Sequence, residues 1–293
     1  MNSPTAITSL TTSPRLSAAE IATAAWERVE RARNLSRPRT SNYLATLCTE
    51  FVPLHGDRLF GDDPALIGGV ARFNGRSVVV MGHQRSGDAK EALRYNFGMP
   101  KPEGYRKAQR LLAQAEKFGF PVLSFIDTPA ADPTLPSEER GQALAIAECI
   151  AAFLAARVPT ISVVIGQGGS GGALAIGVTD RVLMMENAIY AVAPPEAAAS
   201  FLKFPPEQKR DVAAAMRVAA PESAIFGVVD EVIPEPVPAH EDPMGAMHAV
   251  GLALERHLTA LEATHGIGAA VDATSLFETR YAKYRAIGLW EEA

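Results

Sequence analysis

Short apolar runs alternate with longer amphipathic segments through the middle of the chain, and this alternation constrains the fold more than any other feature. The runs are expected as strands and lie at 77–81, 122–126, 161–165, 181–185 and 189–192. Antiparallel strands can be joined by tight turns, whereas parallel strands need long crossover connections. The long helical segments between the runs therefore predict an α/β fold with a mostly parallel sheet and right-handed crossovers. In such folds ligands bind beyond the carboxyl ends of the strands.

The remaining segments predict the other strands and helices of this α/β fold. An Asn74-Gly75 dipeptide between apolar runs at 67–73 and 76–81 predicts a β-hairpin. Periodicity and capping signals predict helices at 17–33, 41–51, 102–118, 137–157, 172–178 and 195–201, and a helix–turn–strand unit at 207–233.

The chain is expected to divide into four segments. Residues 1–16 are rich in Ser, Thr and Pro and are expected to form a disordered tail. Residues 17–52 are expected as an N-terminal helical segment, 53–240 as the α/β domain, and 241–293 as a mostly helical C-terminal segment.

Composition and charge argue against several classes of protein. The formal net charge is −5 over 293 residues, whereas nucleic-acid binding needs a basic surface. Cys48 and Cys149 form no CxxC pair, so neither a disulfide framework nor a zinc site is expected. Charged residues and a proline interrupt the longest apolar stretch, 143–165, so no membrane span is expected. The first residues lack the pattern of a secretory signal, which makes the cytoplasm the expected compartment.

The segment from Gly166 to Gly172 carries five glycines in seven residues, between an expected strand and an expected helix. Glycine lets the backbone approach a ligand closely and tolerates positive φ. The first N–H groups of a helix also lack intrahelical partners. The segment is therefore a candidate array of donors for an anion or a developing oxyanion. A tight packing turn between strand and helix is the alternative.

The same segment fits the dinucleotide pattern G-x-G-x-x-G at Gly166, Gly168 and Gly171, with Glu186 twenty positions after the first glycine. The helix that follows is too short for an ordinary crossover, and two strand–helix units precede the motif, so this interpretation is disfavoured. A P-loop is excluded because Gly-Lys-Ser/Thr is missing. No Ser/His/Asp arrangement and no G-x-S-x-G elbow with ordered partners is recognised.

Two further loops follow expected strands, at 82–88 and 127–131. His83 in the first loop is either a general base or a capping side chain. A basic stripe on the helix at 102–118 is either a site for the phosphates of coenzyme A or a solvated helix face. Its members are Arg106, Lys107 and Arg110, with Arg85 and Lys90 nearby in sequence.

Long motifs spread over nearly the whole chain resemble the carboxyltransferase α subunit of bacterial acetyl-CoA carboxylase. Examples are Asn-Phe-Gly-Met-Pro at 96–100, Pro-Glu-Gly-Tyr-Arg-Lys-Ala at 102–108 and Phe-Ile-Asp-Thr-Pro at 125–129. Further matching runs lie at 54–58, 67–71, 82–84, 138–142, 168–178 and 280–288. So many motifs in the same order make the resemblance specific.

The resemblance implies a crotonase-like ββα superhelix with helical N- and C-terminal extensions. It implies transfer of a carboxyl group from N-carboxybiotin, which sits on a separate carrier protein, to a coenzyme A thioester. The implied partners are a β-type subunit that bears a zinc ribbon, a biotin carboxyl carrier protein and biotin carboxylase, with an α₂β₂ carboxyltransferase core. No metal is expected in this chain.

The resemblance also assigns roles to particular residues. The oxyanion donors would be the N–H groups around Gly171 and Gly172, with a second contribution from the loop at Ala130 and Ala131. No side-chain base is required, because the biotin nitrogen can take the α-proton. The residues expected to bind substrate are Gly168, Gly169, His83, Gln84, Arg85, Arg106 and Lys107.

Departures from the family pattern cluster in the expected site loops. After Asp-Thr-Pro the family continues Gly-Ala-Tyr-Pro-Gly, whereas this chain has Ala-Ala-Asp-Pro-Thr at 130–134. The family's Gly-Glu-Gly-Gly is Gly-Gln-Gly-Gly at 166–169, and its Ser-Pro-Glu-Gly is Pro-Pro-Glu-Ala at 194–197. The family's His-Gln-Lys-Gly-Arg reads His-Gln-Arg-Ser-Gly at 83–87. Alanine keeps the N–H, but at positive φ it costs about 1 kcal/mol.

These departures suit a specialised enzyme with an altered acceptor or donor. Two alternatives stay open. One is a non-catalytic assembly subunit that only orders a β-type partner. The other is a biotin-independent, crotonase-like acyl-CoA enzyme such as a decarboxylase.

Overall fold

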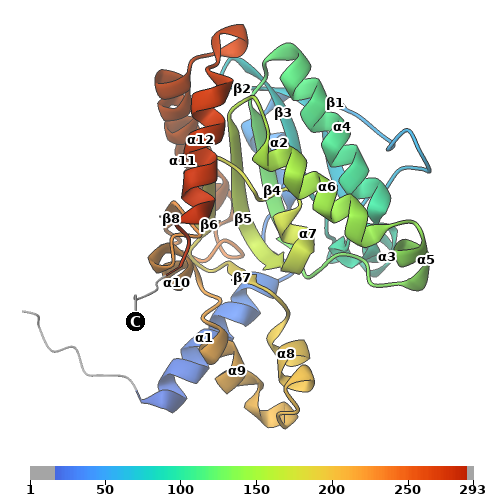
Figure 1. Ribbon diagram of the computed structural model, residues 1–293. Coiled ribbons are helices and arrows are strands. Elements are labelled where there is room, and N and C mark those ends of the chain that lie inside the picture. The colour runs from blue at the N-terminus through green and yellow to red at the C-terminus, as the bar shows by residue number, and fades with distance from the viewer. Residues whose placement is uncertain (1–16, 289–293) are drawn as a thin grey trace, which may run out of the picture.

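The centre of the protein is one eight-stranded sheet, described with the rest of residues 17–288 by a computed structural model (Figure 1). The strand order is β1-β2-β3-β4-β5-β6-β8, and β7 pairs with β5. β1, β2 and β3 pair antiparallel, and the other pairs are parallel. The strands are β1 Thr49–Pro53, β2 Leu66–Phe73, β3 Arg76–His83, β4 Val122–Thr128, β5 Thr160–Gly169, β6 Arg181–Met185, β7 Ile189–Ala191 and β8 Glu231–Ile233. The predicted parallel α/β sheet is thus confirmed.

The antiparallel edge of the sheet departs from expectation in one place. The predicted hairpin of β2 and β3 is confirmed, and its turn residues Asn74 and Gly75 have φ of +45° and +82°. The helix predicted at 41–51 is wrong in its second half, because α2 ends at Leu47 and β1 begins at Thr49. The expected boundary between residues 52 and 53 therefore lies inside a strand that pairs with β2.

The helices follow the predicted order with two breaks that the periodicity did not reveal. α4 begins at Pro102, where a missing N–H costs nothing, and it ends before Gly119 at φ +69°. The single helix predicted at 137–157 is wrong, because Gly141 at φ +81° separates α5 from α6. The unit predicted at 207–233 likewise contains two helices, divided by Arg217 at φ +51°.

The long helices are α1 Ala18–Arg33, α4 Pro102–Phe118, α6 Gln142–Leu154, α11 Pro243–His265 and α12 Ala273–Arg285. The shorter ones are α2 Thr40–Leu47, α3 Ala89–Arg94, α5 Leu135–Glu139, α7 Ser170–Leu174, α8 Pro195–Phe201, α9 Lys209–Met216 and α10 Ala220–Ile225. Among residues 17–288, no helix combines the length and apolarity that a membrane crossing would need.

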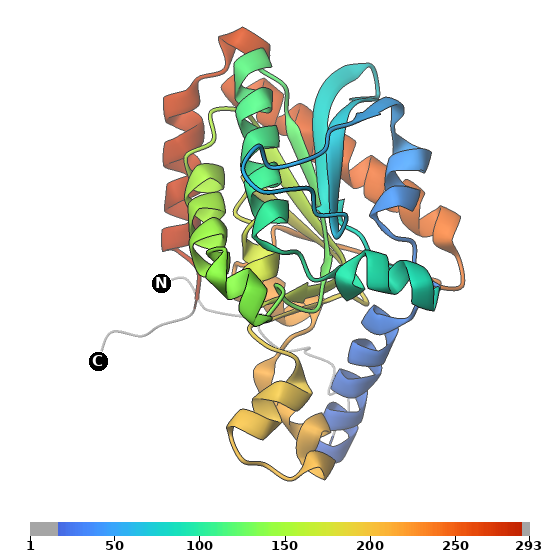
Figure 2. The ribbon, with the colours of Figure 1, turned by 90° about the vertical axis from the view of Figure 1, so that its right-hand side faces the viewer.

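Helices cover both faces of the sheet, with α4 and α6 on one side and α2 and α11 on the other (Figures 1 and 2). Every residue of β4 is buried as a result, which is typical of a parallel strand between two helical layers. Met81, Phe125 and Val163 on three neighbouring strands belong to the same core.

A helical extension of α1, α8 and α9 projects beyond the carboxyl end of the parallel strands (Figure 2). The predicted cap of α1 is confirmed, since Ser17 and Glu20 form a reciprocal capping box. Trp26 and Val29 of α1 pack with Ala213 of α9 in a second, smaller apolar cluster. The expected tail at 1–16 lies outside the described residues.

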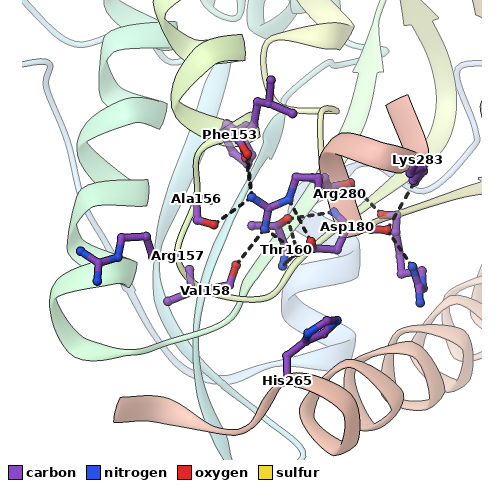
Figure 3. A network of polar contacts seen from close by, with 12 residues as sticks. Phe153, Ala156, Arg157, Val158, Thr160, Asp180, His265, Arg280 and Lys283 are labelled. Carbon is purple, nitrogen blue, oxygen red and sulfur yellow. Dashed lines mark hydrogen bonds and ion pairs between the residues drawn. The ribbon is translucent and has the colours of Figure 1, made fainter. Parts of the chain in front are cut away.

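A fully buried arginine fastens the C-terminal helix α12 to the domain (Figure 3). Arg280 donates from Nε and Nη2 to the two carboxylate oxygens of Asp180, each at 2.9 Å. Asp180 Oδ2 also accepts from the N–H and the hydroxyl of Thr160, both at 2.8 Å. Arg280 Nη1 donates to three carbonyls at the end of α6, those of Phe153, Leu154 and Ala156. The last carbonyls of a helix have no intrahelical donor, and here the buried guanidinium supplies one to the carbonyls at the end of α6.

Candidate active site

The glycine-rich segment is a strand for half of its length, not a loop. β5 continues to Gly169, and its last residues, 167–169, pair with β7. The expectation of a loop beginning at Gly166 is therefore wrong. The helix α7 starts immediately after the strand, at Ser170.

The glycines of this segment serve close approach rather than unusual backbone angles. A Cβ added at Gly169 would lie 1.9 Å from the carbonyl oxygen of Pro129, and one at Gly168 would lie 2.5 Å from the ring of Tyr190. None of the five glycines from 166 to 172 has a positive φ. At Gly169 the strand can therefore approach the loop after β4, and at Gly168 it can approach the ring of Tyr190 on β7. Both contacts form only because these residues have no side chain.

The positive φ in the segment belongs to Ser170, at +56°. A non-glycine residue in this region is held there by its surroundings and often marks a functional site. Gly168-Gly169-Ser170-Gly171-Gly172 also fits the strand–serine–helix pattern G-x-S-x-G, a signal that the sequence contained and that was not recognised.

Ser170 lines an open hollow of about 260 Å³ beside α7. The rest of its wall is mostly apolar and comes from α7, β7 and the residue after β7. The lining residues are Ser170, Gly171, Leu174, Tyr190, Ala191 and Val192.

The structure brings together the two backbone segments that were expected to carry oxyanion donors. A Cβ added at Gly172 would lie 2.7 Å from the nitrogen of Ala131 and 3.0 Å from the carbonyl carbon of Ala130. The Ala131 N–H has no acceptor among the described residues. The N–H groups in the first turn of α7, which includes Gly171, have no intrahelical acceptors either. The nitrogen of Ala131 in the loop after β4 thus lies close to Gly172 in the first turn of α7.

Ala130 and Ala131 do not adopt positive φ. The strain that alanine in place of glycine could have caused is therefore absent. The N–H of Ala130, however, donates to the Thr128 hydroxyl at 3.2 Å, which leaves Ala131 as the available donor of the pair.

His83 and Gln84 lie inside the protein, and their expected contact with substrate stays a prediction. His83 is fully buried, and its Nδ1 accepts from the N–H of Asp127 at 3.3 Å. Burial lowers the pKa of His83 to about 4, against a smaller opposite effect of the Asp127 charge. The imidazole is therefore neutral at pH 7, which suits the capping alternative. Gln84 exchanges hydrogen bonds with Ser41 of α2 at 3.1 Å.

Three of the cations considered for the phosphates of coenzyme A have acidic partners, whereas Arg110 donates to the backbone carbonyls of Gly56 and His55. Arg85 pairs with Asp127 at 2.9 Å. Arg106 pairs with Asp57 at 2.8 Å and also reaches Glu103. The buried Lys107 donates to Asp62 at 2.5 Å and to the carbonyl of Asp63. Acidic partners therefore neutralise Arg85, Arg106 and Lys107, and binding of phosphates by the stripe stays a prediction.

Asp127 at the end of β4 joins two of the site loops. Its Oδ1 accepts from the N–H of Gln167 at 3.0 Å and from Arg85. The Gln167 side chain is held in turn by Arg33, which also pairs with Glu196 at 2.6 Å. No cluster of metal-ligating side chains occurs among the described residues.

Known proteins match this chain over most of its length. A family model described as acetyl co-enzyme A carboxylase carboxyltransferase-like matches residues 5–288. The acetyl-coenzyme A carboxylase carboxyl transferase subunit alpha of Syntrophomonas wolfei is 47% identical over 264 residues, which cover 90% of this chain and 81% of that protein. The subunit of the same name from Deinococcus radiodurans is 48% identical over 268 residues, which cover 91% and 83%.

Solved structures with the same fold include chains of two multisubunit enzymes. The transcarboxylase 12S core, with hydrolysed methylmalonyl-coenzyme A bound, has a TM-score of 0.60 at 23% identity over 81% of this chain and 45% of that chain. A chain of a Pseudomonas malonate decarboxylase hetero-tetramer in complex with coenzyme A has a TM-score of 0.61 at 18% identity over 77% and 90%. The predicted crotonase-like α/β fold is confirmed by these likenesses. The family model over residues 5–288 and the relatives at 47–48% identity lead to one conclusion: the chain belongs to the acetyl-CoA carboxylase carboxyltransferase α family.

Proposed function

We propose that this chain is the α-type half of a biotin-dependent acyl-CoA carboxyltransferase, which moves a carboxyl group from N-carboxybiotin on a carrier protein to an acyl thioester. The observation that carries the proposal is the close approach of Ala131 to Gly172, which places an N–H without an acceptor among the described residues beside the first turn of α7. Membership of the family supports it.

The chemistry requires a site that stabilises a negative oxygen. Release of the carboxyl group leaves negative charge on the ureido oxygen of biotin. Preorganised N–H donors stabilise such a charge without reorganising during the reaction. In this chain the donors are the N–H groups of Gly171, Gly172 and Ala131. The apolar wall of the adjacent hollow, formed by residues such as Leu174 and Val192, suits the hydrocarbon part of a bicyclic ring.

The acyl thioester forms an enolate and needs a second oxyanion site. We place that site on a β-type partner. Leu174 and Val192 support this, because they border the hollow with 42% and 79% of their surface exposed. Phe201 and Leu202, on or directly after α8, are also 79% and 64% exposed. Large apolar side chains exposed in one region are typical of a protein interface.

The complete enzyme would contain this chain, the β-type subunit with its zinc ribbon, the biotin carboxyl carrier protein and biotin carboxylase. We propose an α₂β₂ carboxyltransferase core located in the cytoplasm. Carboxybiotin and the coenzyme A thioester enter as substrates, and no metal in this chain takes part. A permanent α–β interface of this kind would bury roughly 2,000 Å² or more.

The purified chain is expected to show no carboxyltransferase activity until the β-type subunit is added. The reason is that only one of the two oxyanion sites belongs to this chain. The measurement is decarboxylation of malonyl-CoA, the reverse direction, with free biotin as acceptor. The chain alone, the β-type subunit alone and their mixture are compared at equal concentrations.

Two results would contradict the shared site. Full activity of the chain alone, with or without biotin, would favour the biotin-independent decarboxylase. Equal activity of the β-type subunit alone and of the mixture would favour the non-catalytic assembly subunit.

Acetyl-CoA is not expected to be the best acceptor. Asp132 stands where the family has Tyr, and its side chain turns inward to accept hydrogen bonds from Thr134 and Ser137 at 2.8 and 2.5 Å. The site therefore lacks the aromatic surface of the family, which leaves room for a larger acyl group. One added methylene in an apolar pocket changes kcat/KM about 10-fold. The measurement is the steady-state kcat/KM of the assembled enzyme for acetyl-, propionyl- and butyryl-CoA. The highest value for acetyl-CoA would contradict the prediction.

A further inference from the structure

The hydroxyl of Tyr105 lies against the same point as the proposed backbone donors. Tyr105 belongs to the first turns of α4 and is fully buried. Its Oη is 2.9 Å from the position that a Cβ on Gly172 would occupy, and the nitrogen of Ala131 is 2.7 Å from the same position. Within residues 17–288 this hydroxyl has no hydrogen-bond partner. An unpaired side-chain donor thus accompanies the unpaired N–H of Ala131.

A buried hydroxyl without a partner weakens the resting fold, because its hydration is lost and nothing replaces it. Phenylalanine would fill the same ring volume without that loss. Burial also raises the pKa of Tyr105 well above its usual value, so the phenol keeps its proton at every physiological pH. The structure therefore places a neutral hydrogen-bond donor beside the proposed oxyanion site.

We propose that Tyr105 is a further catalytic residue, whose hydroxyl donates a hydrogen bond to the negative oxygen that the N–H groups of Gly172 and Ala131 stabilise. The inference rests on the proposed function and deepens it, since it adds a side-chain donor to a site built from backbone. The proton stays on Tyr105 throughout, and no bond to it forms or breaks. A buried phenol suits this role because a hydrogen bond to a developing charge is strongest where water is excluded.

Tyr43 provides a matched control. It is also fully buried, its hydroxyl also lacks a partner among the described residues, and its ring stacks on Phe125 with the centroids 5.5 Å apart. Its hydroxyl is not among the atoms nearest to Gly172. Tyr43→Phe therefore removes the same group from an equally buried place outside the proposed site.

The experiment compares the parent, Tyr105→Phe and Tyr43→Phe chains, each assembled with the β-type subunit. Malonyl-CoA decarboxylation with free biotin gives kcat and KM, and thermal unfolding of each chain gives Tm. Both variants are expected to unfold at the same or a higher temperature than the parent. Tyr105→Phe is expected to lose about 100-fold in kcat with KM for malonyl-CoA unchanged, and Tyr43→Phe is expected to keep the parent kcat.

A purely structural role for Tyr105 predicts either that Tyr105→Phe keeps kcat or that kcat falls only together with Tm. If Tyr105→Phe keeps kcat within twofold of an active parent, or if kcat falls only together with Tm, the inference is overturned and the proposed function stands. If the assembled parent itself has no activity, the proposed function is overturned and the inference with it.

Discussion

Replacing Gly172 by valine is expected to abolish carboxyl transfer while the chain still folds and assembles. Any Cβ at this position would lie 2.7 Å from the nitrogen of Ala131 and 3.0 Å from the carbonyl carbon of Ala130, so the two donor segments must move apart. Losing one oxyanion donor costs about 10²–10³ in rate, and here both segments are displaced. Because the conflict arises at Cβ, Gly172→Ala should already show most of the loss. The assembled complexes are compared by kcat for malonyl-CoA decarboxylation.

Gly61→Val is the matched control for this change. Gly61 has no atom within 4 Å of an added Cβ and does not have a positive φ, so valine there should leave kcat and assembly unchanged. Size-exclusion chromatography with the β-type subunit reports assembly of each variant. Near-normal turnover of a correctly assembled Gly172→Val complex would refute the assignment of α7 and the β4 loop as donors.

Replacing Arg280 by methionine is expected to lower the free energy of unfolding by about 3–5 kcal/mol. The side chain of Arg280 is fully buried and pairs with Asp180, of whose side chain 3% is exposed. Methionine keeps the apolar stem but leaves the Asp180 carboxylate and the carbonyls at the end of α6 without their donor (Figure 3). Urea denaturation of the purified parent and variant chains measures the loss in the free energy of unfolding.

Arg256→Met is the control, because it makes the same change of charge and side-chain length at an exposed position. Arg256 lies in α11, its side chain is 59% exposed, and it pairs with Glu231 at the surface, so its loss should cost less than about 1 kcal/mol. Adding Asp180→Asn to Arg280→Met should restore part of the stability, because the uncompensated charge is then removed. A loss below about 1 kcal/mol for Arg280→Met would show that water or other donors replace the guanidinium.

The elements that were predicted correctly are those with strong local signals. Helix α4 has a proline at its first position and a left-handed glycine after its last, and both bounds were predicted. The Asn74-Gly75 hairpin and the apolar parallel strands are similar cases, because turn chemistry and side-chain periodicity act within a few residues. The errors fall where such signals conflict. Gly141 divides an otherwise continuous apolar helical pattern, and Thr49–Pro53 becomes a strand only by pairing with β2.

The backbone part of the site could be predicted and the side-chain part could not. Glycine at 172 and the loop at 130–131 were recognised because a glycine cluster at a strand–helix junction, together with the family resemblance, points to backbone donors. The ion pairs of Arg106 and Lys107 on α4 could not be predicted, because their acidic partners, Asp57 and Asp62, lie some 45 to 49 positions earlier in the chain. Nothing in the local sequence indicates that such a pairing forms.

The sequence by itself determined the α/β class, the strand–helix order, the family and the backbone segments that are proposed to carry the donors. These follow from short-range periodicity and from motifs read in order. Only the tertiary structure decided that Ser170 takes the positive φ while its glycine neighbours make room for other backbone. It also decided that His83 is sealed in the core and that Tyr105 reaches Gly172. The physical reason is that burial, pairing and close approach depend on residues far apart in the chain, and packing alone brings them together.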